Sequence, residues 1–164
     1  MLAFVMPVAM AAITYYFGTF QMSGTIAASK VLFTDGADTS AIGGTVGTGN
    51  ATFTATGLPM VAGVDIIIDQ AVKIKNIDSI AHGVTLAWTS DTFAAECTLI
   101  RVILVAPNAT EYEAVVLDGS GAVTTTSTSV NMINGTVWVV KIEIHLDDDA
   151  SVAARAIVLQ LSYT

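Results

Sequence analysis

The chain has 164 residues, of which 53% are hydrophobic and 12% charged, and its formal net charge is −8. This length suits one domain with its own core, and the acidic balance excludes the basic surface that nucleic-acid binding requires. Ordinary globular domains carry about 25% charged residues. We therefore expect other copies of the chain, lipid or attached sugar to cover much of the surface.

The N-terminal stretch, residues 1–29, contains no charged side chain. Its apolar front half is similar to the central region of a signal peptide, with Ala9-Met10-Ala11 as a cleavage pattern. It lacks the basic residues that begin a signal peptide, so we expect it to belong to the mature protein. Pro7 and the polar residues after Gly18 make it a poor bilayer span, which needs about 20 apolar residues.

An ordered apolar arm has to be buried in a bilayer, in a bundle of helices from several copies, or in a groove of a neighbouring subunit. We divide the chain into an apolar assembly arm, residues 1–24, and a β-sandwich domain, residues 25–164. The arm residues expected at the subunit interface are Leu2, Phe4, Val5, Met6, Val8, Met10, Ile13, Tyr15 and Phe17.

After residue 25, apolar residues recur at every second position, which is typical of half-buried strands. We predict strands near residues 64–75, 84–88, 98–105, 111–117, 137–146 and 152–163. The even-numbered apolar residues from Val64 to Ile74 and from Trp138 to Leu146 are expected to face the core. So are the odd-numbered ones from Ile157 to Tyr163. About eight to ten short strands without a βαβ rhythm predict an all-β fold, a jelly-roll-like β-sandwich with an extended apolar N-terminal arm.

No catalytic constellation is present, and we expect the chain not to be an enzyme and to have no small-molecule substrate. His82 and His145 each lack a second ligand at metal spacing and are expected at the surface. Cys97 is alone, so no disulfide framework exists. We expect no cofactor. The acidic turn Asp147, Asp148 and Asp149 is a weak candidate for Ca²⁺, because aspartate is also an ordinary turn residue.

Three Asn-x-Thr sequons begin at Asn50, Asn108 and Asn134, each in a stretch that is typical of a loop or a strand start. Such sequons also arise by chance in a threonine-rich chain. Together with the N-terminal stretch, they favour a secreted glycoprotein.

Short motifs carry a resemblance to a known family. Tyr16-Phe-Gly-Thr-Phe-Gln-Met-Ser-Gly-Thr-Ile26, leading into Lys30-Val-Leu-Phe33, resembles the start of TasA-type matrix-fibre proteins, and archaeal bundling pilins and cannula proteins are similar. Val72-Lys-Ile-Lys-Asn-Ile-Asp78, followed by Val84-Thr-Leu-Ala-Trp88, resembles the strand, asparagine turn and strand of that fold. The last strand, acidic turn and strand fit its closing hairpin.

The resemblance implies an extracellular filament assembled by donor-strand complementation, in which the N-terminal strand of one subunit fills a groove in the next. Such fibres serve adhesion, biofilm formation or cell–cell connection. The partners would be identical subunits in a helical homopolymer. This chain differs in its longer leading apolar run with Pro7, which cannot donate to a β-ladder.

Two alternatives stay open. In a type IV pilin-like subunit the N-terminal segment would be a helix bundled in the filament core, and Ala9 to Ala12 support this reading. Gly18 and the aromatic cluster from Tyr15 to Phe17 oppose it. In a membrane-anchored binding module, residues 1–20 would span a bilayer and the sandwich would recognise a ligand. A lattice or capsid coat protein would share nearly every feature.

Overall fold

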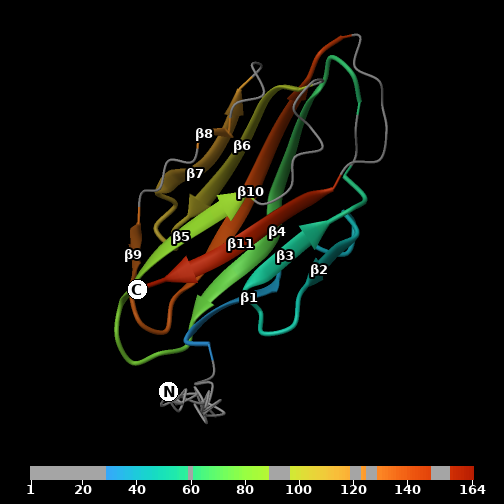
Figure 1. The fold of residues 1–164 in the computed structure, drawn as a ribbon. Coiled ribbons are helices and arrows are strands. Elements are labelled where there is room, and N and C mark those ends of the chain that lie inside the picture. The colour runs from blue at the N-terminus through green and yellow to red at the C-terminus, as the bar shows by residue number, and fades with distance from the viewer. Residues whose placement is uncertain (1–28, 59–60, 89–96, 119–122, 125–128, 149–155) are drawn as a thin grey trace, which may run out of the picture.

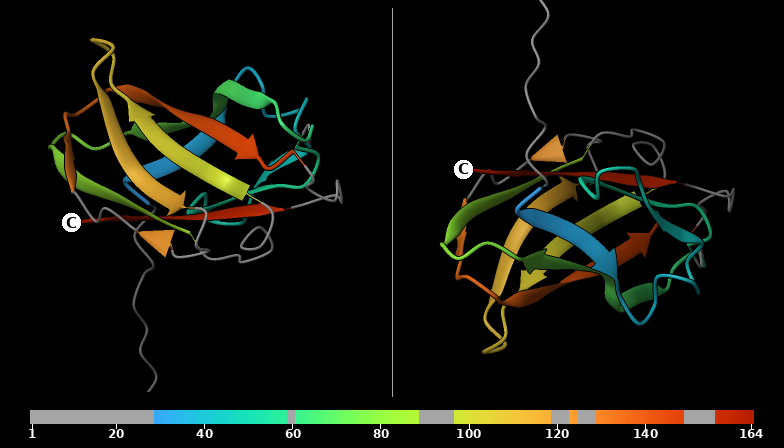
Figure 2. Two further views of the ribbon diagram at one scale, coloured as in Figure 1. Left: turned by 90° about the horizontal axis from the view of Figure 1, so that it is seen from above. Right: turned by 90° about the horizontal axis from the view of Figure 1, so that it is seen from below.

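Two antiparallel sheets pack face to face to form a β-sandwich (Figures 1 and 2). The computed structural model describes residues 29–58, 61–88, 97–118, 123–124, 129–148 and 156–164. No helix in these ranges is long and apolar enough to cross a bilayer. The predicted all-β sandwich is confirmed, whereas the assembly arm, residues 1–24, lies outside the described residues.

The described residues form eleven strands, three of them with three residues or fewer. The six-stranded sheet has the order β1 (Val31–Asp35), β4 (Asp65–Asn76), β10 (Val137–Leu146), β6 (Cys97–Val105), β7 (Glu111–Asp118) and β8 (Val123–Thr124). The five-stranded sheet has the order β2 (Gly44–Val46), β3 (Thr52–Ala55), β11 (Ile157–Tyr163), β5 (His82–Trp88) and β9 (Val130–Met132).

The chain crosses repeatedly from one sheet to the other, as in a jelly roll. Its last two strands lie inside different sheets: β10 pairs with β4 and β6, and β11 pairs with β3 and β5. The predicted closing hairpin is therefore wrong. Alternation of apolar residues shows which face of a strand is buried, but it carries no information about the neighbouring strand.

The core lies between the inner faces of the two sheets and follows the predicted alternation. In β10 every second residue, Trp138, Val140, Ile142, Ile144 and Leu146, is buried. In β11 the buried residues are Ile157, Leu159 and Leu161.

Two of the predicted core residues are exposed instead. Val64 is 47% exposed because it precedes β4, in a turn closed by its N–H bond to the carbonyl of Val61 at 3.3 Å. Tyr163 is 36% exposed because it ends β11 at the margin of the sheet.

A β-bulge in the middle of β4 shifts its register against β10. Val72 lies opposite Val140, but Ile68 lies opposite Ile142, so β4 has two extra residues between these pairs. The loop after β1 satisfies the bulged backbone, because Asp38 donates its N–H to the carbonyl of Gln70 at 3.1 Å and accepts the N–H of Gln70 at 2.9 Å. Bulges of this kind bend a strand and end its pairing on one side.

The two sheets differ in charge. No strand of the five-stranded sheet contains Asp, Glu, Lys or Arg, and Thr85 and Ser162 form a 2.8 Å hydrogen bond on its outer face. The outer face of the six-stranded sheet carries a network in which Arg101 contacts Glu113 and Glu143, and Lys141 contacts Glu143 at 2.8 Å. Among the described strands, the charged residues thus all belong to the six-stranded sheet.

Ile142→Ala tests the core. Ile142 is fully buried at the centre of β10, so its truncation is expected to lower the free energy of unfolding by about 2–5 kcal/mol. The measurement is urea denaturation followed by tryptophan fluorescence. Val137→Ala, at a 40% exposed position of the same strand, is the control and is expected to change it by less than about 1 kcal/mol. Equal losses in the two variants would contradict the assignment.

Candidate assembly surfaces at the two ends of the sandwich

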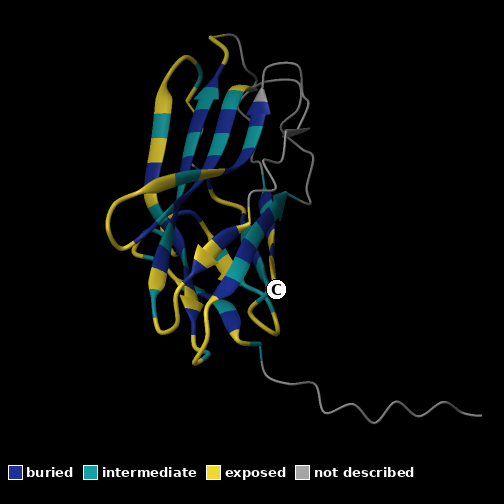
Figure 3. Ribbon diagram, turned by 90° about the vertical axis from the view of Figure 1, so that its left-hand side faces the viewer, coloured by how far each residue is buried: buried dark blue, intermediate teal, exposed yellow. Residues whose placement is uncertain are grey.

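The large apolar side chains that the described residues expose lie at two opposite ends of the sandwich. One end, here called the basal end, is where β4 finishes and the described chain begins (Figure 1). The other, the apical end, is where β4 begins and β10 finishes. The basal end exposes Ile77, Ile80, Ile133, Val137 and Tyr163 by 36–60%, and the apical end exposes Val61, Val64 and Ile67 by 47–57%. Figure 3 shows the exposure along the strands between these ends.

One buried side chain holds the turns of the basal end together. Asn76, the last residue of β4, is 0% exposed. Its side-chain amide donates to the carbonyls of Ile80 at 2.9 Å and Met132 at 3.0 Å, and its side-chain oxygen accepts the N–H of Asp78 at 2.9 Å. The exposed isoleucines at 80 and 133 are therefore presented by turns fixed to the same residue.

A polar cluster joins the start of the described chain to the same end. The backbone carbonyl of Lys30 accepts a 2.8 Å hydrogen bond from the N–H of Ile77. The Lys30 ammonium group lies 3.1 Å from the Asp78 carboxylate. Hydrogen bonds from His82 and then Lys30 hold the pKa of Asp78 well below its usual range. The uncharged stretch, residues 1–29, therefore joins the sandwich directly beside the exposed isoleucines.

His82 is not the surface residue that the sequence predicted. It is 8% exposed, and its ring nitrogens lie 2.9 Å from the Asp78 carboxylate and 3.2 Å from the carbonyl of Thr164. Its ring also packs edge-on against Tyr163, with centroids 5.1 Å apart. His145 agrees with the prediction, because its side chain is 42% exposed and pairs with Asp65.

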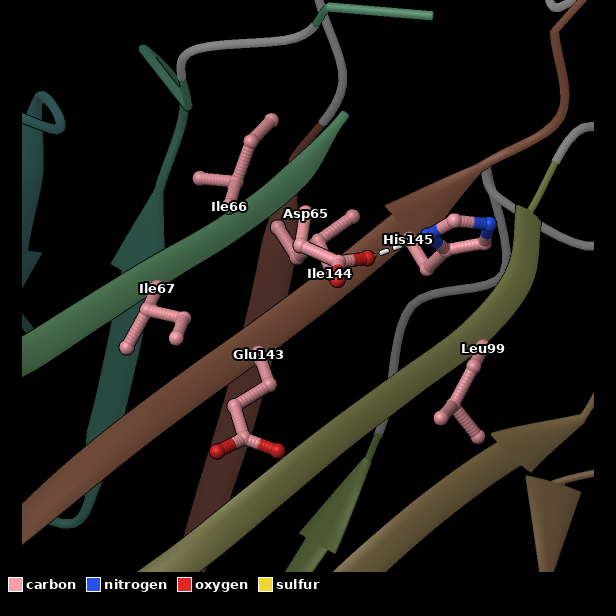
Figure 4. Close-up of a pocket in the computed structure, with 7 residues that line it drawn as sticks. All are labelled: Asp65, Ile66, Ile67, Leu99, Glu143, Ile144 and His145. Atoms are coloured by element: carbon pink, nitrogen blue, oxygen red, sulfur yellow. Dashed lines mark hydrogen bonds and ion pairs between the residues drawn. The ribbon is translucent and has the colours of Figure 1, made fainter. Parts of the chain in front are cut away.

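The apical end combines apolar and acidic side chains. The turn that carries Val61 and Val64 is attached to the end of β10 by a hydrogen bond from Gly63 N–H to the carbonyl of Leu146, at 3.3 Å. Below it, the outer face of the sheet has a shallow hollow of about 190 Å³. Figure 4 shows Ile67 and Leu99 on opposite sides of this hollow and the Asp65–His145 pair at one margin.

The first five residues of β4, 65–69, pair with a described strand on one side only. β1 pairs with residues 72–76 of β4, whereas β10 continues to Asp65. Among the described residues, no strand lies on the β1 side of residues 65–69, and Ile67 is exposed there. An unpaired edge offers N–H and C=O groups to an added strand.

The three sequons lie in exposed turns. Asn50 has a positive φ of 56° in the turn before β3, and Asn108 accepts the N–H of Thr110 at 3.2 Å. Asn134 lies in the basal turn, next to Gly135, whose φ is 69°. All three asparagines are exposed, which is the placement that a sugar chain requires, and their glycosylation stays a prediction.

The acidic turn is described in part. Asp147 and Asp148 are exposed at the apical end, where Asp147 accepts a hydrogen bond from the hydroxyl of Thr98, and Asp149 lies outside the described residues. Within the described ranges, no group of three or more Asp, Glu, His or Cys side chains is arranged to hold a metal ion. The Ca²⁺ site stays a prediction.

The basal isoleucines and the burial of Asn76 were not among the features predicted from the sequence. A signal was present, since Ile77, Ile80 and Ile133 stand in short polar turns between strands, where apolar residues have no core to face. The nine interface residues predicted in the arm, from Leu2 to Phe17, all lie outside the described residues.

Asn76→Ala tests the role of the buried amide. Removal leaves the carbonyls of Ile80 and Met132 without this donor, so the free energy of unfolding is expected to fall by about 1–3 kcal/mol. Chemical denaturation measures the loss, and hydrogen exchange of the two basal turns is expected to accelerate. Asn131→Ala, at an exposed position in β9, is the control with little expected effect. Unchanged exchange in the turns would contradict the role of Asn76.

Glu143→Gln tests the network on the six-stranded sheet. Lys141, and then Arg101, lowers the pKa of Glu143 below its ordinary value of 4.5. A carboxyl group with a lowered pKa stabilises the fold above its ordinary pKa, and this contribution disappears as the pH falls through the folded-state value. Wild type is therefore expected to be more stable than Glu143→Gln, with a larger difference in melting temperature at pH 7 than at pH 3. Thermal unfolding at both pH values measures this difference. Asp69→Asn, at an exposed position with no ion pair to a described residue, is the control. A constant difference between wild type and Glu143→Gln would contradict the prediction.

No protein-family model matches the chain, and no similar curated protein was found. The resemblance to TasA-type fibre proteins stays a prediction based on the short motifs quoted above.

Proposed function

We propose that this chain is the structural subunit of an extracellular homopolymeric filament that assembles through its N-terminal segment. The observation that carries the proposal is the position of the exposed apolar residues at two opposite ends of the sandwich, with the uncharged stretch joined to one of them. Monomeric proteins rarely expose large apolar patches, which usually mark contact sites.

Strand addition supplies a mechanism for the segment. The segment leaves from the basal end, and the unpaired edge of β4, residues 65–69, lies at the apical end. The segment of one copy can therefore reach the edge of the next, and backbone hydrogen bonds along the edge would join them. Burial of half a dozen apolar arm side chains would contribute roughly 10–15 kcal/mol, at about 1.5–3 kcal/mol each. Ordering of the arm offsets a large part of this gain.

The low charge and the exposed sequons support a role outside the cell. A filament covers the apolar ends of its subunits, and sugar chains at Asn50, Asn108 and Asn134 would cover part of the sides. Such a fibre serves adhesion, biofilm formation or cell–cell connection, and requires neither enzymatic activity nor a cofactor.

Removal of residues 1–24 tests the proposal. The full chain is expected to form fibres and the shortened form to stay monomeric, as seen by negative-stain microscopy and size-exclusion chromatography. A peptide of residues 1–15 is expected to block fibre growth, whereas a scrambled peptide of the same composition should have no effect. Far-UV circular dichroism of the shortened form checks that the sandwich still folds.

Two other results would contradict the proposed assembly. Fibres formed by the shortened chain, or a full chain that remains monomeric in detergent, would mean that the segment acts as an anchor or has no part in assembly. A helical signal that appears in the fibres but not in the shortened form would replace strand insertion with a bundle of N-terminal helices.

A further inference from the structure

The two ends of the sandwich are complementary to each other. We propose that the basal end of one copy docks directly on the apical end of the next, through exposed side chains of the folded sandwich that lie beside the backbone edge of β4 where the arm would insert. This inference rests on the proposed function, because both concern a homopolymer, but it can fail on its own.

The apolar part of the basal surface is a projection, and the apolar part of the apical surface is a hollow. Ile80 and Ile133 project at the basal end, 59% and 60% exposed, and the hydrogen bonds of Asn76 fix both turns. The apical hollow of about 190 Å³ has apolar walls at Ile67 and Leu99, while Glu143 lies between them and the Asp65–His145 pair lies at one margin. A cavity of about 150 Å³ admits a benzene-sized apolar group, so this hollow has room for one isoleucine side chain.

The charges of the two ends have opposite sign. The apical end exposes Asp147 and Asp148, and also Asp65, which pairs with His145. At the basal end Lys75 is exposed beside Val137 and has no ion pair to another described residue, while Asp78 is already engaged by Lys30 and His82. Opposite charges at the margins of an apolar contact fix its orientation and accelerate association.

The charged side of the sandwich lacks this complementarity. Arg101 and Lys141 are paired with glutamates of the same chain. Surface pairs that are already formed contribute little to a new contact. The ends therefore remain the surfaces on which a second copy gains both apolar burial and charge pairing.

The geometry of the contact decides the form of the product. A two-fold dimer needs one patch that is complementary to itself, whereas here two different patches meet. A contact between different patches repeats from copy to copy, and where the rotation does not close a ring it gives an open filament. Because the two patches lie at opposite ends of the same molecule, each added copy presents a free end to the next.

Two full-length variants test the contact, each with one end blocked. Ile80→Glu with Ile133→Glu places acidic groups at the basal end, where they would face the apical aspartates. Val64→Glu with Ile67→Glu places acidic groups at the apical end, where they would be buried against Ile80 and Ile133 and would also repel the blocked basal end of the other variant. All four positions are 47–60% exposed, so both variants are expected to fold, which circular dichroism checks.

Each variant alone is expected to raise the critical concentration for fibre growth about tenfold or more, since apolar anchors dominate such contacts. An equimolar mixture is expected to form a heterodimer by analytical ultracentrifugation, because one intact basal end meets one intact apical end. Thr45→Glu with Gln160→Glu, at exposed positions of the five-stranded sheet, is the matched control and should grow fibres of normal length.

Normal fibres from the two blocked variants, or a mixture that stays monomeric, would overturn the inference. The proposed function would survive either result if removal of residues 1–24 still abolished fibres. If wild type forms no fibres at all, the proposed function fails first, and the heterodimer assay, run at high protein concentration, then decides whether the ends bind each other.

Discussion

The packing of two inner faces against each other is the constraint on which the rest of the structure depends. The buried rows of β10 and β11 meet in one core, so the outer faces have to carry what polarity the chain has. Packing of the two sheets buries their inner faces but leaves the two ends of the sandwich exposed to solvent. The apolar residues at both ends are thus exposed by the architecture, and in the proposed filament another copy would cover them.

The bulge in β4 connects the fold to this need. At the two extra residues near Gln70, the loop after β1 supplies the hydrogen bonds that a paired strand would otherwise make. β1 therefore pairs only with the second half of β4. Within the described ranges, no strand pairs with the β1 side of the first half, at the apical end. Native proteins usually shorten, charge or cover such edges, and here Asp65 and Asp69 flank Ile67. This arrangement discourages indiscriminate pairing while leaving room for an uncharged strand.

Much of the fold follows from the sequence, and less of the candidate site does. A period of two along β10 identifies its buried face, from Trp138 to Leu146, without any structure. The same pattern cannot show that β10 and β11 separate into different sheets, because pairing depends on contacts distant in the chain. Nor could it identify Asn76 as buried, since an asparagine between strands usually indicates a turn. Its burial depends on carbonyl groups that only the folded turns bring together.

Hydrogen–deuterium exchange of the assembled full chain, compared with the form that lacks residues 1–24, tests the central claim most directly. Assembly is expected to slow exchange in residues 61–69 at the apical end and in residues 77–81 and 133–136 at the basal end. Exchange in residues 101–105 of β6 and 111–116 of β7, beside the paired charges of the six-stranded sheet, should stay the same. Protection confined to the sides of the sandwich, or no protection at either end, would contradict head-to-tail assembly.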